Sequence, residues 1–305
     1  MSNANKKRAF KKKLPLTIMA LPGIVFIFVF DYIPLYGLVL PFKNFNVAKG
    51  FFKSPWSGIE NFRYLFRSSA LWNATRNTIL YNLAFILIGT TVCVLLATFL
   101  FELGKKAVKI YQTVLLLPYF ISWVVASYIV QAFLNYESGV VNSLLDDLGL
   151  EKVLWYNNPT GWPIIIMIAY LWKNIGYNMI VYYAALMGLD MECFEAARID
   201  GAGWWQQLRY ITIPGIKNVV MISIILAVGK ILYGDFGLFY NVTMNSSLLY
   251  PATDVVDTLV YRMLLDLGDI GMSAASGFVQ SVLGFVLTIT VNSIVNKINP
   301  ENALF

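Results

Sequence analysis

Apolar residues in this chain are gathered into long blocks that are separated by shorter polar segments. A helix that crosses the hydrocarbon core of a bilayer needs about 20 mostly apolar residues, and six blocks reach that length. They cover residues 16–38, 77–101, 112–134, 162–188, 216–240 and 275–297. The first block has a basic front like that of a signal peptide, but its apolar run is long and no small-residue cleavage site follows it. We therefore expect an all-α membrane protein whose membrane domain, residues 16–305, has six transmembrane helices.

The distribution of lysine and arginine predicts the orientation of these helices, because cytoplasmic loops are enriched in both residues. The tail 1–15 has no acidic residue, and its basic residues are Lys6, Lys7, Arg8, Lys11, Lys12 and Lys13. Segment 102–111 is also basic, as expected inside, whereas segments 135–161 and 241–274 are mainly acidic, as expected outside. We therefore place the N- and C-termini in the cytoplasm, as six crossings require.

Segment 41–76 opposes this topology, since it lies on the predicted outer side but holds six basic residues and one acidic residue. We keep the topology because the first span and its flank usually dominate orientation. Within this segment, Ile59–Phe66 has the mixed spacing of an interfacial helix. An ordered loop is an equally good interpretation.

Composition supports a membrane protein and argues against several other classes. The chain has 305 residues, of which 58% are hydrophobic and 13% charged, whereas soluble chains are about half apolar and about a quarter charged. The net charge of +6 resides in short flanks between apolar blocks, so we expect no nucleic-acid binding. Histidine is absent, and Cys93 and Cys193 lie in different environments. We therefore expect no catalytic site, no metal site and no disulfide.

The most informative segment is the loop 189–215, between the fourth and fifth apolar blocks on the predicted cytoplasmic side. Asp190 is placed to cap a helix whose interior holds good helix formers. Gly201 then bends the chain, a second short helix begins near Trp204, and Pro214 opens the next span. The pattern predicts a short bent helix pair, which suits either the docking of another protein or an ordinary connection between spans.

Several residues of this loop stand at fixed offsets that match a known pattern. They are Glu195, Ala196, Ala197, Gly201, Ile211 and Pro214. With these residues the loop resembles the cytoplasmic signature of permease subunits of bacterial binding-protein-dependent ABC importers, although Ile213 stands where the family has leucine. Elsewhere the chain is similar to the sugar-importing subgroup related to the maltose permeases, through Asn61-Phe62, Asn77-Thr78, Pro118 and residues 171–179. Within that subgroup it looks closest to oligosaccharide permeases of the aldouronate or pectin-fragment type.

The resemblance implies a type I ABC importer permease fold in a bacterial cell membrane, with the loop as a coupling helix seated in an ATP-binding subunit. The coupling residues that it implies are Glu195, Ala196, Ala197, Arg198, Asp200 and Gly201. It also implies partners: a second homologous permease, two ATP-binding subunits, an extracytoplasmic solute-binding protein, membrane lipid and an oligosaccharide substrate, which would include acidic plant or algal fragments. ATP and magnesium would bind to the partner, since this chain has no Gly-x4-Gly-Lys-[Ser/Thr] motif and we expect no cofactor in it.

Polar residues within the apolar blocks are candidates for a substrate path, because charges inside a span usually face a cavity or a partner. In the fourth block, Tyr170, Lys173, Asn174 and Tyr177 share one helical face. Rings, an amide and a cation suit a sugar or a uronate, but a polar contact with the second permease would need the same residues. In the fifth block, Lys230 and Tyr233 are further candidates.

Three other functions are weighed against the ATP-driven importer. An ion-coupled secondary transporter of a small polar solute would need intramembrane carboxylates or inverted repeats, and only Asp31 and Asp235 are available, both near the outer side. A membrane hydrolase would need clustered acids, histidine or a Gly-x-Ser-x-Gly turn. A passive channel would not need the loop 189–215.

Overall fold

The computed structural model describes residues 15 and 17–298, and throughout that part of the chain the regular structure is helical. Five helices are long and apolar enough to cross a membrane, and the count reaches six when two helices that meet at a bend are taken as one crossing. The spans are Thr17–Phe42, Ser69–Phe101, the bent pair Lys105–Phe120 and Trp123–Leu134, Pro159–Leu186, Trp204–Val228 and Ile270–Lys297. The predicted all-α membrane fold is confirmed, while the basic residues of the tail 1–15 lie outside the described residues.

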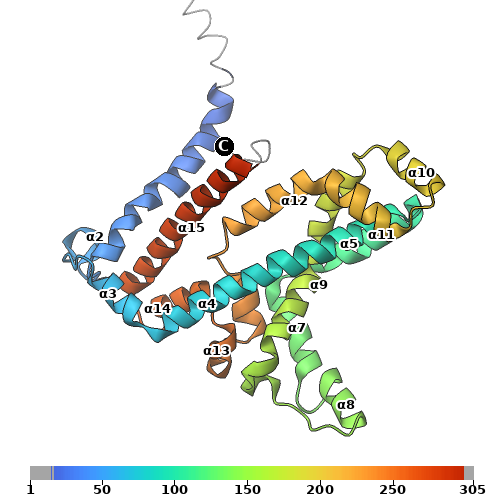
Figure 1. Cartoon of the computed structure of the whole chain (residues 1–305). Coiled ribbons are helices and arrows are strands. Elements are labelled where there is room, and N and C mark those ends of the chain that lie inside the picture. The colour runs from blue at the N-terminus through green and yellow to red at the C-terminus, as the bar shows by residue number, and fades with distance from the viewer. Residues whose placement is uncertain (1–14, 16, 299–305) are drawn as a thin grey trace, which may run out of the picture.

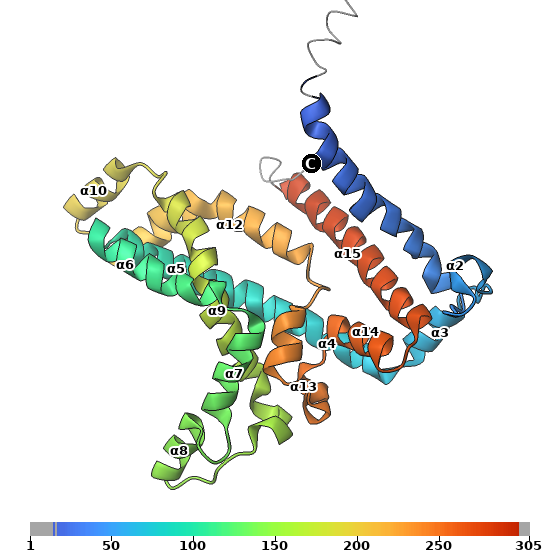
Figure 2. The ribbon, with the colours of Figure 1, turned by 180° about the vertical axis from the view of Figure 1, so that it is seen from behind.

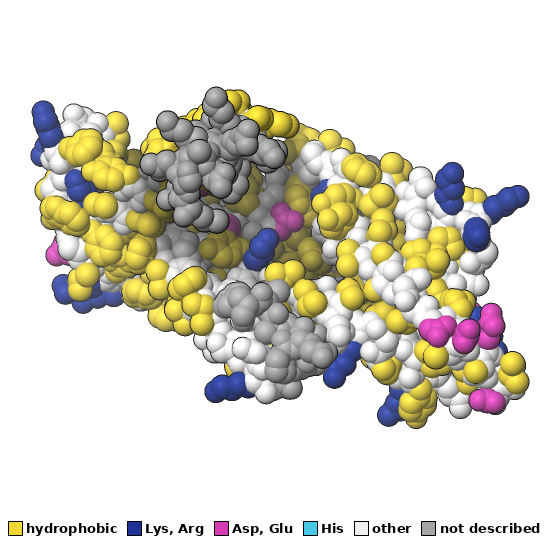
Figure 3. Space-filling model, turned by 90° about the horizontal axis from the view of Figure 1, so that it is seen from above, with side chains coloured by type: hydrophobic (Ala, Val, Ile, Leu, Met, Phe, Trp, Pro, Cys, Tyr) yellow, Lys and Arg dark blue, Asp and Glu magenta, His cyan; other side chains and the backbone are white. Residues whose placement is uncertain are grey.

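The first and last spans pair with each other and form an arm, which we define as Thr17–Phe42 together with α15 (Ile270–Ile298). Figures 1 and 2 show that the arm stands beside the remaining helices and meets them at α3 (Glu60–Arg67) and α14 (Val256–Leu265), and α15 also contacts α12 (Ile213–Val228). Residues 17–36 are exposed along the arm. Seen from above, apolar side chains cover both the arm and the other helices, and the surface between them is hollowed (Figure 3). Such an apolar surface needs lipid or another subunit to cover it.

The other long helices form the body of the molecule. α4 (Ser69–Ala84) continues through the π-turn η3 (Phe85–Gly89) into α5 (Thr90–Phe101), which makes one long span. α9 (Trp162–Leu186) packs along α5 and also contacts α6 (Lys105–Leu116). Buried residues where α5, α9 and α12 meet are Cys93, Ala97, Leu100, Met179, Tyr182, Leu186 and Ile216. This cluster fixes the helices that line the site described below.

The third span differs from the continuous helix expected over residues 112–134. After α6, the 3-10 turn η4 (Leu117–Phe120) ends in a bend of 99°, and α7 (Trp123–Leu134) follows. Such a bend leaves carbonyl groups without helical partners. The Lys173 ammonium on α9 supplies hydrogen-bond donors to two carbonyl oxygens at the bend.

The fifth span also differs from its expected range, residues 216–240. Its helix begins earlier, at Trp204, and α12 (Ile213–Val228) ends twelve residues before the expected end. Turns over residues 229–235 interrupt it before the π-helical turn η8 (Leu238–Val242). The span is therefore broken, and this break borders the site.

Short helices complete the two ends of the molecule. The start of the described chain, the end of α15 and α10 (Met191–Ile199) lie on one side, with α8 (Val140–Asp147) and α13 (Tyr250–Thr253) on the opposite side (Figures 1 and 2). The first and last described residues lie on the same side, which fits an even number of crossings between them. The expected interfacial segment 59–66 forms helix α3 rather than an irregular loop. The remaining α-helices are α2 (Gly50–Lys53) and α11 (Trp204–Gln207).

Candidate functional site

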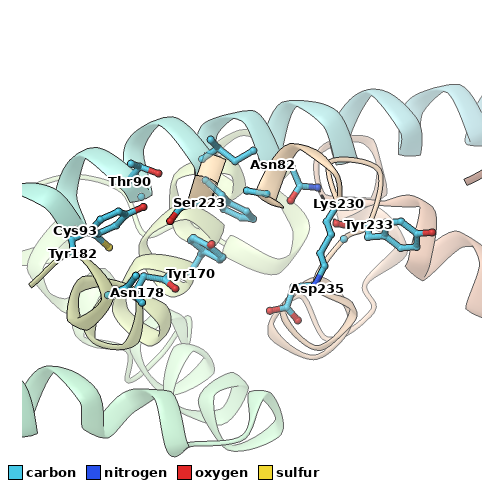
Figure 4. A pocket seen from close by; sticks show the side chains of 16 residues that line it. Asn82, Thr90, Cys93, Tyr170, Asn178, Tyr182, Ser223, Lys230, Tyr233 and Asp235 are labelled. Atoms are coloured by element: carbon cyan, nitrogen blue, oxygen red, sulfur yellow. Dashed lines mark hydrogen bonds between the residues drawn. The ribbon is translucent and has the colours of Figure 1, made fainter. Parts of the chain in front are cut away.

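A cavity of about 430 Å³ opens in the body between α4, α5, α9 and the end of α12 (Figure 4). Its volume lies within the range of about 300–1,000 Å³ that small-molecule pockets occupy. The polar residues that line it are Asn82, Thr90, Tyr170, Asn178, Tyr182, Ser223, Lys230, Tyr233 and Asp235. One wall is aromatic, since the Phe85 and Tyr170 rings stack with centroids 3.8 Å apart. The cavity therefore combines flat apolar rings with hydrogen-bonding groups.

The break in the fifth span forms a second wall, which we call the wall segment and define as residues 229–235. Non-helical backbone at membrane depth is tolerated where it lines a cavity and where other groups satisfy its polar atoms. The Asn82 amide on α4 donates to the carbonyl oxygens of Ile231 and Tyr233, both at 3.0 Å. A side chain from another span thus replaces hydrogen bonds that a continuous helix would have made.

Asp235 ends the wall segment and begins the next helical turn. Its Oδ1 accepts from the Leu238 amide at 3.2 Å, and its Oδ2 accepts from Trp123 Nε1 at 2.8 Å. Lys230, at the other end of the segment, extends along the cavity toward Asp235 (Figure 4). These two are the charged side chains among the described residues that line the cavity. The cavity therefore presents both a cation and a carboxylate.

The structure divides the six residues predicted for the substrate path into two groups. The residues that line the cavity are Tyr170, Lys230 and Tyr233. Lys173 is buried, 8% exposed, and its ammonium lies on the carbonyl oxygens of Tyr119, at 2.9 Å, and Ile121. Asn174 donates to a carbonyl oxygen of its own helix, and Tyr177 stacks on the Tyr119 ring at 4.5 Å. Of the predicted face of α9, Tyr170 therefore lines the cavity, whereas Lys173 and Tyr177 contact the bend of the third span.

Most polar residues of the cavity were missed because they are spread over several spans that only the tertiary structure brings together. Asn82, Asn178 and Ser223 come from α4, α9 and α12. Asp235 was considered only as a carboxylate near the outer side of its span, but the break brings it and Lys230 to one cavity. Glycines at both ends of the segment, at positions 229 and 234, were a sequence signal for that break.

On the side that carries α10, the loop 189–215 forms the bent helix pair that its sequence predicts. Asp190 is the N-cap of α10, as expected, and its Oδ1 accepts from the Glu192 amide at 3.0 Å. Phe194 is 1% exposed and packs on Phe101, with ring centroids 5.2 Å apart. One buried aromatic ring thus anchors α10 to the end of α5.

The end of α10 is defined by Gly201, whose φ of +79° lies in the left-handed region that favours glycine. The Ala202 amide donates to the Ala197 carbonyl oxygen at 2.9 Å, which is the 6→1 bond of a Schellman-type helix end. Gln206 Oε1 then accepts from the Gly203 amide at 2.7 Å, where α11 begins. The bend between α10 and α11 is therefore built from local sequence.

The residues predicted to contact an ATP-binding subunit lie together on α10 and its end. Those exposed are Glu195, Ala196, Arg198, Asp200 and Gly201, while Ala197 is half-buried. Arg198 forms an ion pair with Glu102 at the end of α5, with an N–O distance of 2.8 Å. Exposed ion pairs contribute at most about 1 kcal/mol, so Arg198 can exchange this partner for another at low cost. An exposed, anchored and bent helix pair can serve as a docking element.

The described residues contain no group of three or more Cys, Asp or Glu side chains that could hold a metal ion.

Outside the spans, burial raises the pKa of the Asp257 carboxyl, against the opposing effect of hydrogen bonds from Gly234 and Gln280. A cavity at a broken span, together with an exposed helix pair on one side, defines a helical membrane transport protein.

Comparison with known proteins identifies its family. Residues 89–300 match the family described as the inner membrane component of binding-protein-dependent transport systems, and the chain belongs to this family. Among relatives, protein LplB of Bacillus subtilis is 31% identical over 96% of this chain and 92% of its own length. The polygalacturonan/rhamnogalacturonan transport system permease protein YteP of the same organism is 29% identical, over 94% of this chain and 89% of its own.

A solved structure confirms the fold of this family. The structure is that of a bacterial ABC transporter involved in the import of the acidic polysaccharide alginate. One of its chains superposes on this chain with a TM-score of 0.87 and is 30% identical to it, and the match covers 97% of this chain and 99% of the other. The chain is therefore a multi-pass permease component of the cell membrane with the type I ABC importer fold.

Proposed function

We propose that this chain forms half of the translocation path of an ATP-driven importer of oligosaccharides. The other half would be a second homologous permease, with two ATP-binding subunits on the α10 side and a solute-binding protein on the opposite side. The observation that carries the proposal is the cavity at the broken fifth span, with rings and hydrogen-bonding groups on its walls. Rings suit the apolar faces of sugars, and amides and hydroxyls suit their hydroxyl groups. The ion-coupled alternative finds no support among the relatives.

An acidic oligosaccharide is the substrate class that the cavity fits best. Lys230 is the cation among the described residues that line the cavity and can face a uronate carboxylate, while the Asp235 carboxylate already accepts from Trp123 and Leu238. Charge-assisted hydrogen bonds are about twice as strong as neutral ones. The relatives support this choice, because YteP is named for polygalacturonan and rhamnogalacturonan and the structural neighbour imports alginate.

ATP-driven movement would enter through the bent helix pair. Closure of two ATP-binding subunits would displace α10, and Phe194 would pass that displacement to the end of α5, which lines the cavity further along. Rigid helices joined at packed contacts move as bodies, so a shift at α10 would rock the body between two arrangements.

The substrate class can be tested by transport into proteoliposomes that hold the complete complex, with the binding protein on one side and ATP on the other. The probes are a galacturonate oligosaccharide and a neutral xylo-oligosaccharide of equal length. We expect Lys230→Met to reduce uptake of the acidic probe at least about tenfold, because a hydrogen bond to a charged group contributes about 1.5–3 kcal/mol. Uptake of the neutral probe should change less than about twofold, because the neutral sugar has no carboxylate to bond to the Lys230 ammonium.

Lys217→Met is the matched control, since this exposed lysine lies on α12, the helix that precedes the wall segment, and outside the cavity lining. It should leave the uptake of both probes unchanged. Equal uptake of the acidic probe by wild type and Lys230→Met would refute the proposed acidic substrate. Uptake of neither probe by wild type would refute the oligosaccharide class.

A further inference from the structure

Asp257 lies behind the wall segment, outside the lining of the cavity, in the first turn of α14. Its Oδ2 accepts from the Gly234 amide at 2.6 Å and from Gln280 Nε2 on α15 at 3.3 Å. Gln280 also donates to the carbonyl oxygen of Leu232 at 2.6 Å. Two backbone groups of the wall segment are therefore bound from behind, one by α14 and one by α15.

The contact between the wall segment and α14 is close as well as polar. A Cβ atom on Gly234 would lie 2.9 Å from Val255 Cγ2 and 3.1 Å from Asp257 Oδ2, which leaves no room for an intervening water. The bond from the Gly234 amide to an ionised carboxylate is of the stronger, charge-assisted kind. The arginine of α14, Arg262, is paired with Asp254 at an N–O distance of 2.6 Å. Asp257 therefore has the wall segment and Gln280 as its partners.

The two helices that hold the wall segment are connected to the arm: α15 is part of it, and α14 packs on α15. α14 and α15 share an apolar cluster with α3 and α4, whose buried residues include Val256, Leu259 and Ala275. A further contact runs from the hydroxyl of Tyr233 to Ser281 Oγ on α15, at 3.3 Å. Any displacement of α14 or α15 relative to the body would thus be passed to the wall segment.

We propose that Asp257 is a positioning residue of the transport cavity. With Gln280 it ties the wall segment to α14 and α15, and so sets where Lys230 and Tyr233 stand against the transported molecule. The inference rests on the proposed function of the cavity and adds a route by which rearrangement of the arm reaches its wall. The tie acts only through the backbone of the segment, because Asp257 itself does not reach the cavity lining.

The test uses the complete complex in proteoliposomes and measures the KM and maximal rate of uptake of the galacturonate oligosaccharide. Asp257→Ala removes the acceptor, whereas Asp257→Asn keeps an oxygen that can accept from the Gly234 amide. We expect Asp257→Ala to raise KM at least about fivefold and Asp257→Asn to raise it less than about twofold, given the energy of a hydrogen bond to a charged acceptor. Asp266→Ala, at an exposed acid that ends the same helix, should leave KM unchanged.

A second measurement reads the position of the wall directly. Tyr233→Cys, in a background with Cys93→Ser and Cys193→Ser, is labelled by a soluble thiol reagent with and without Asp257→Ala. We expect Asp257→Ala to change the labelling rate at least about threefold and Asp266→Ala to leave it unchanged, since exposure follows the backbone tie. If Asp257→Ala fails to assemble, the KM of uptake and the labelling rate are measured for Gln280→Ala instead, because this variant removes the donor to the Leu232 carbonyl oxygen.

A wild-type KM and labelling rate in the alanine variants would overturn the inference. So would a loss of assembled complex in which the remaining complexes keep the wild-type KM, because that result describes a role in folding alone. The labelling measurement needs no transport, so it remains informative where the wild type takes up neither sugar probe. Failure of the proposed function and failure of this inference are thereby distinguished.

Discussion

Gly201 allows a sharp test of whether the bend after α10 couples this chain to an ATP-binding subunit. A Cβ atom built on Gly201 meets nothing within 4 Å, so a small side chain causes no clash. The cost comes from φ, +79°, which an alanine adopts only at about 1 kcal/mol or more relative to glycine. Because 1.4 kcal/mol corresponds to about a tenfold change in an equilibrium, Gly201→Ala should reduce the population of the bent form about fivefold.

Three substitutions grade this effect. Gly201→Asn should be milder than Gly201→Ala, since asparagine adopts the left-handed region more readily. Gly201→Asp has similar backbone tolerance but adds a second carboxylate beside Asp200, so it should impair docking most. Gly104→Ala is the control, because Gly104 lies in a nearby loop on the same side, has a φ of −65° and also has open space around its Cβ position.

The assay is vanadate-sensitive ATP hydrolysis by the complex co-purified with its ATP-binding subunit, at matched membrane levels of this chain. Hydrolysis or co-purification should fall in the order wild type, Asn, Ala, Asp, with Gly104→Ala equal to wild type. Wild-type hydrolysis in all three Gly201 variants would refute the coupling role of this bend. An equal defect in Gly104→Ala would refute the argument from φ.

Three other predictions follow from single contacts. Gly176→Ala should lower the stability of the protein in detergent by about 1–3 kcal/mol, because a Cβ atom there would lie 2.0 Å from a carbonyl oxygen of α6. Gly277→Ala is the control and should leave the melting temperature unchanged, because the space around its Cβ position is open. Lys173→Met should lower the melting temperature by leaving two carbonyl groups at the bend unpaired, at about 1–3 kcal/mol each, while Lys230→Met should not. A soluble maleimide should modify Cys193 in the native protein and Cys93 only after denaturation, as mass spectrometry would show.

Hydropathy was sufficient to predict the class of fold and the approximate positions of the spans. Apolar blocks of about 20 residues have few stable alternatives to membrane helices. The bend after α10 was also predictable, because its determinants are local: Asp190 caps the helix, and Gly201 takes the left-handed conformation that ends it. The same local reasoning could not show that Phe194 anchors α10, since that contact joins residues far apart in the sequence.

The breaks in the third and fifth spans were not predictable from hydropathy, because both fall inside blocks that are apolar as a whole and the groups that stabilise them lie elsewhere. Asn82 satisfies the carbonyl of Ile231, 149 residues away, and Gln280 satisfies that of Leu232, 48 residues away. Lys173 does the same for the bend of the third span. A polar side chain inside one span is costly unless it finds partners, and unpaired backbone in another span is costly for the same reason. Isolated polar residues within apolar blocks should therefore be considered as partners for breaks in other spans, as well as candidates for direct contact with substrate.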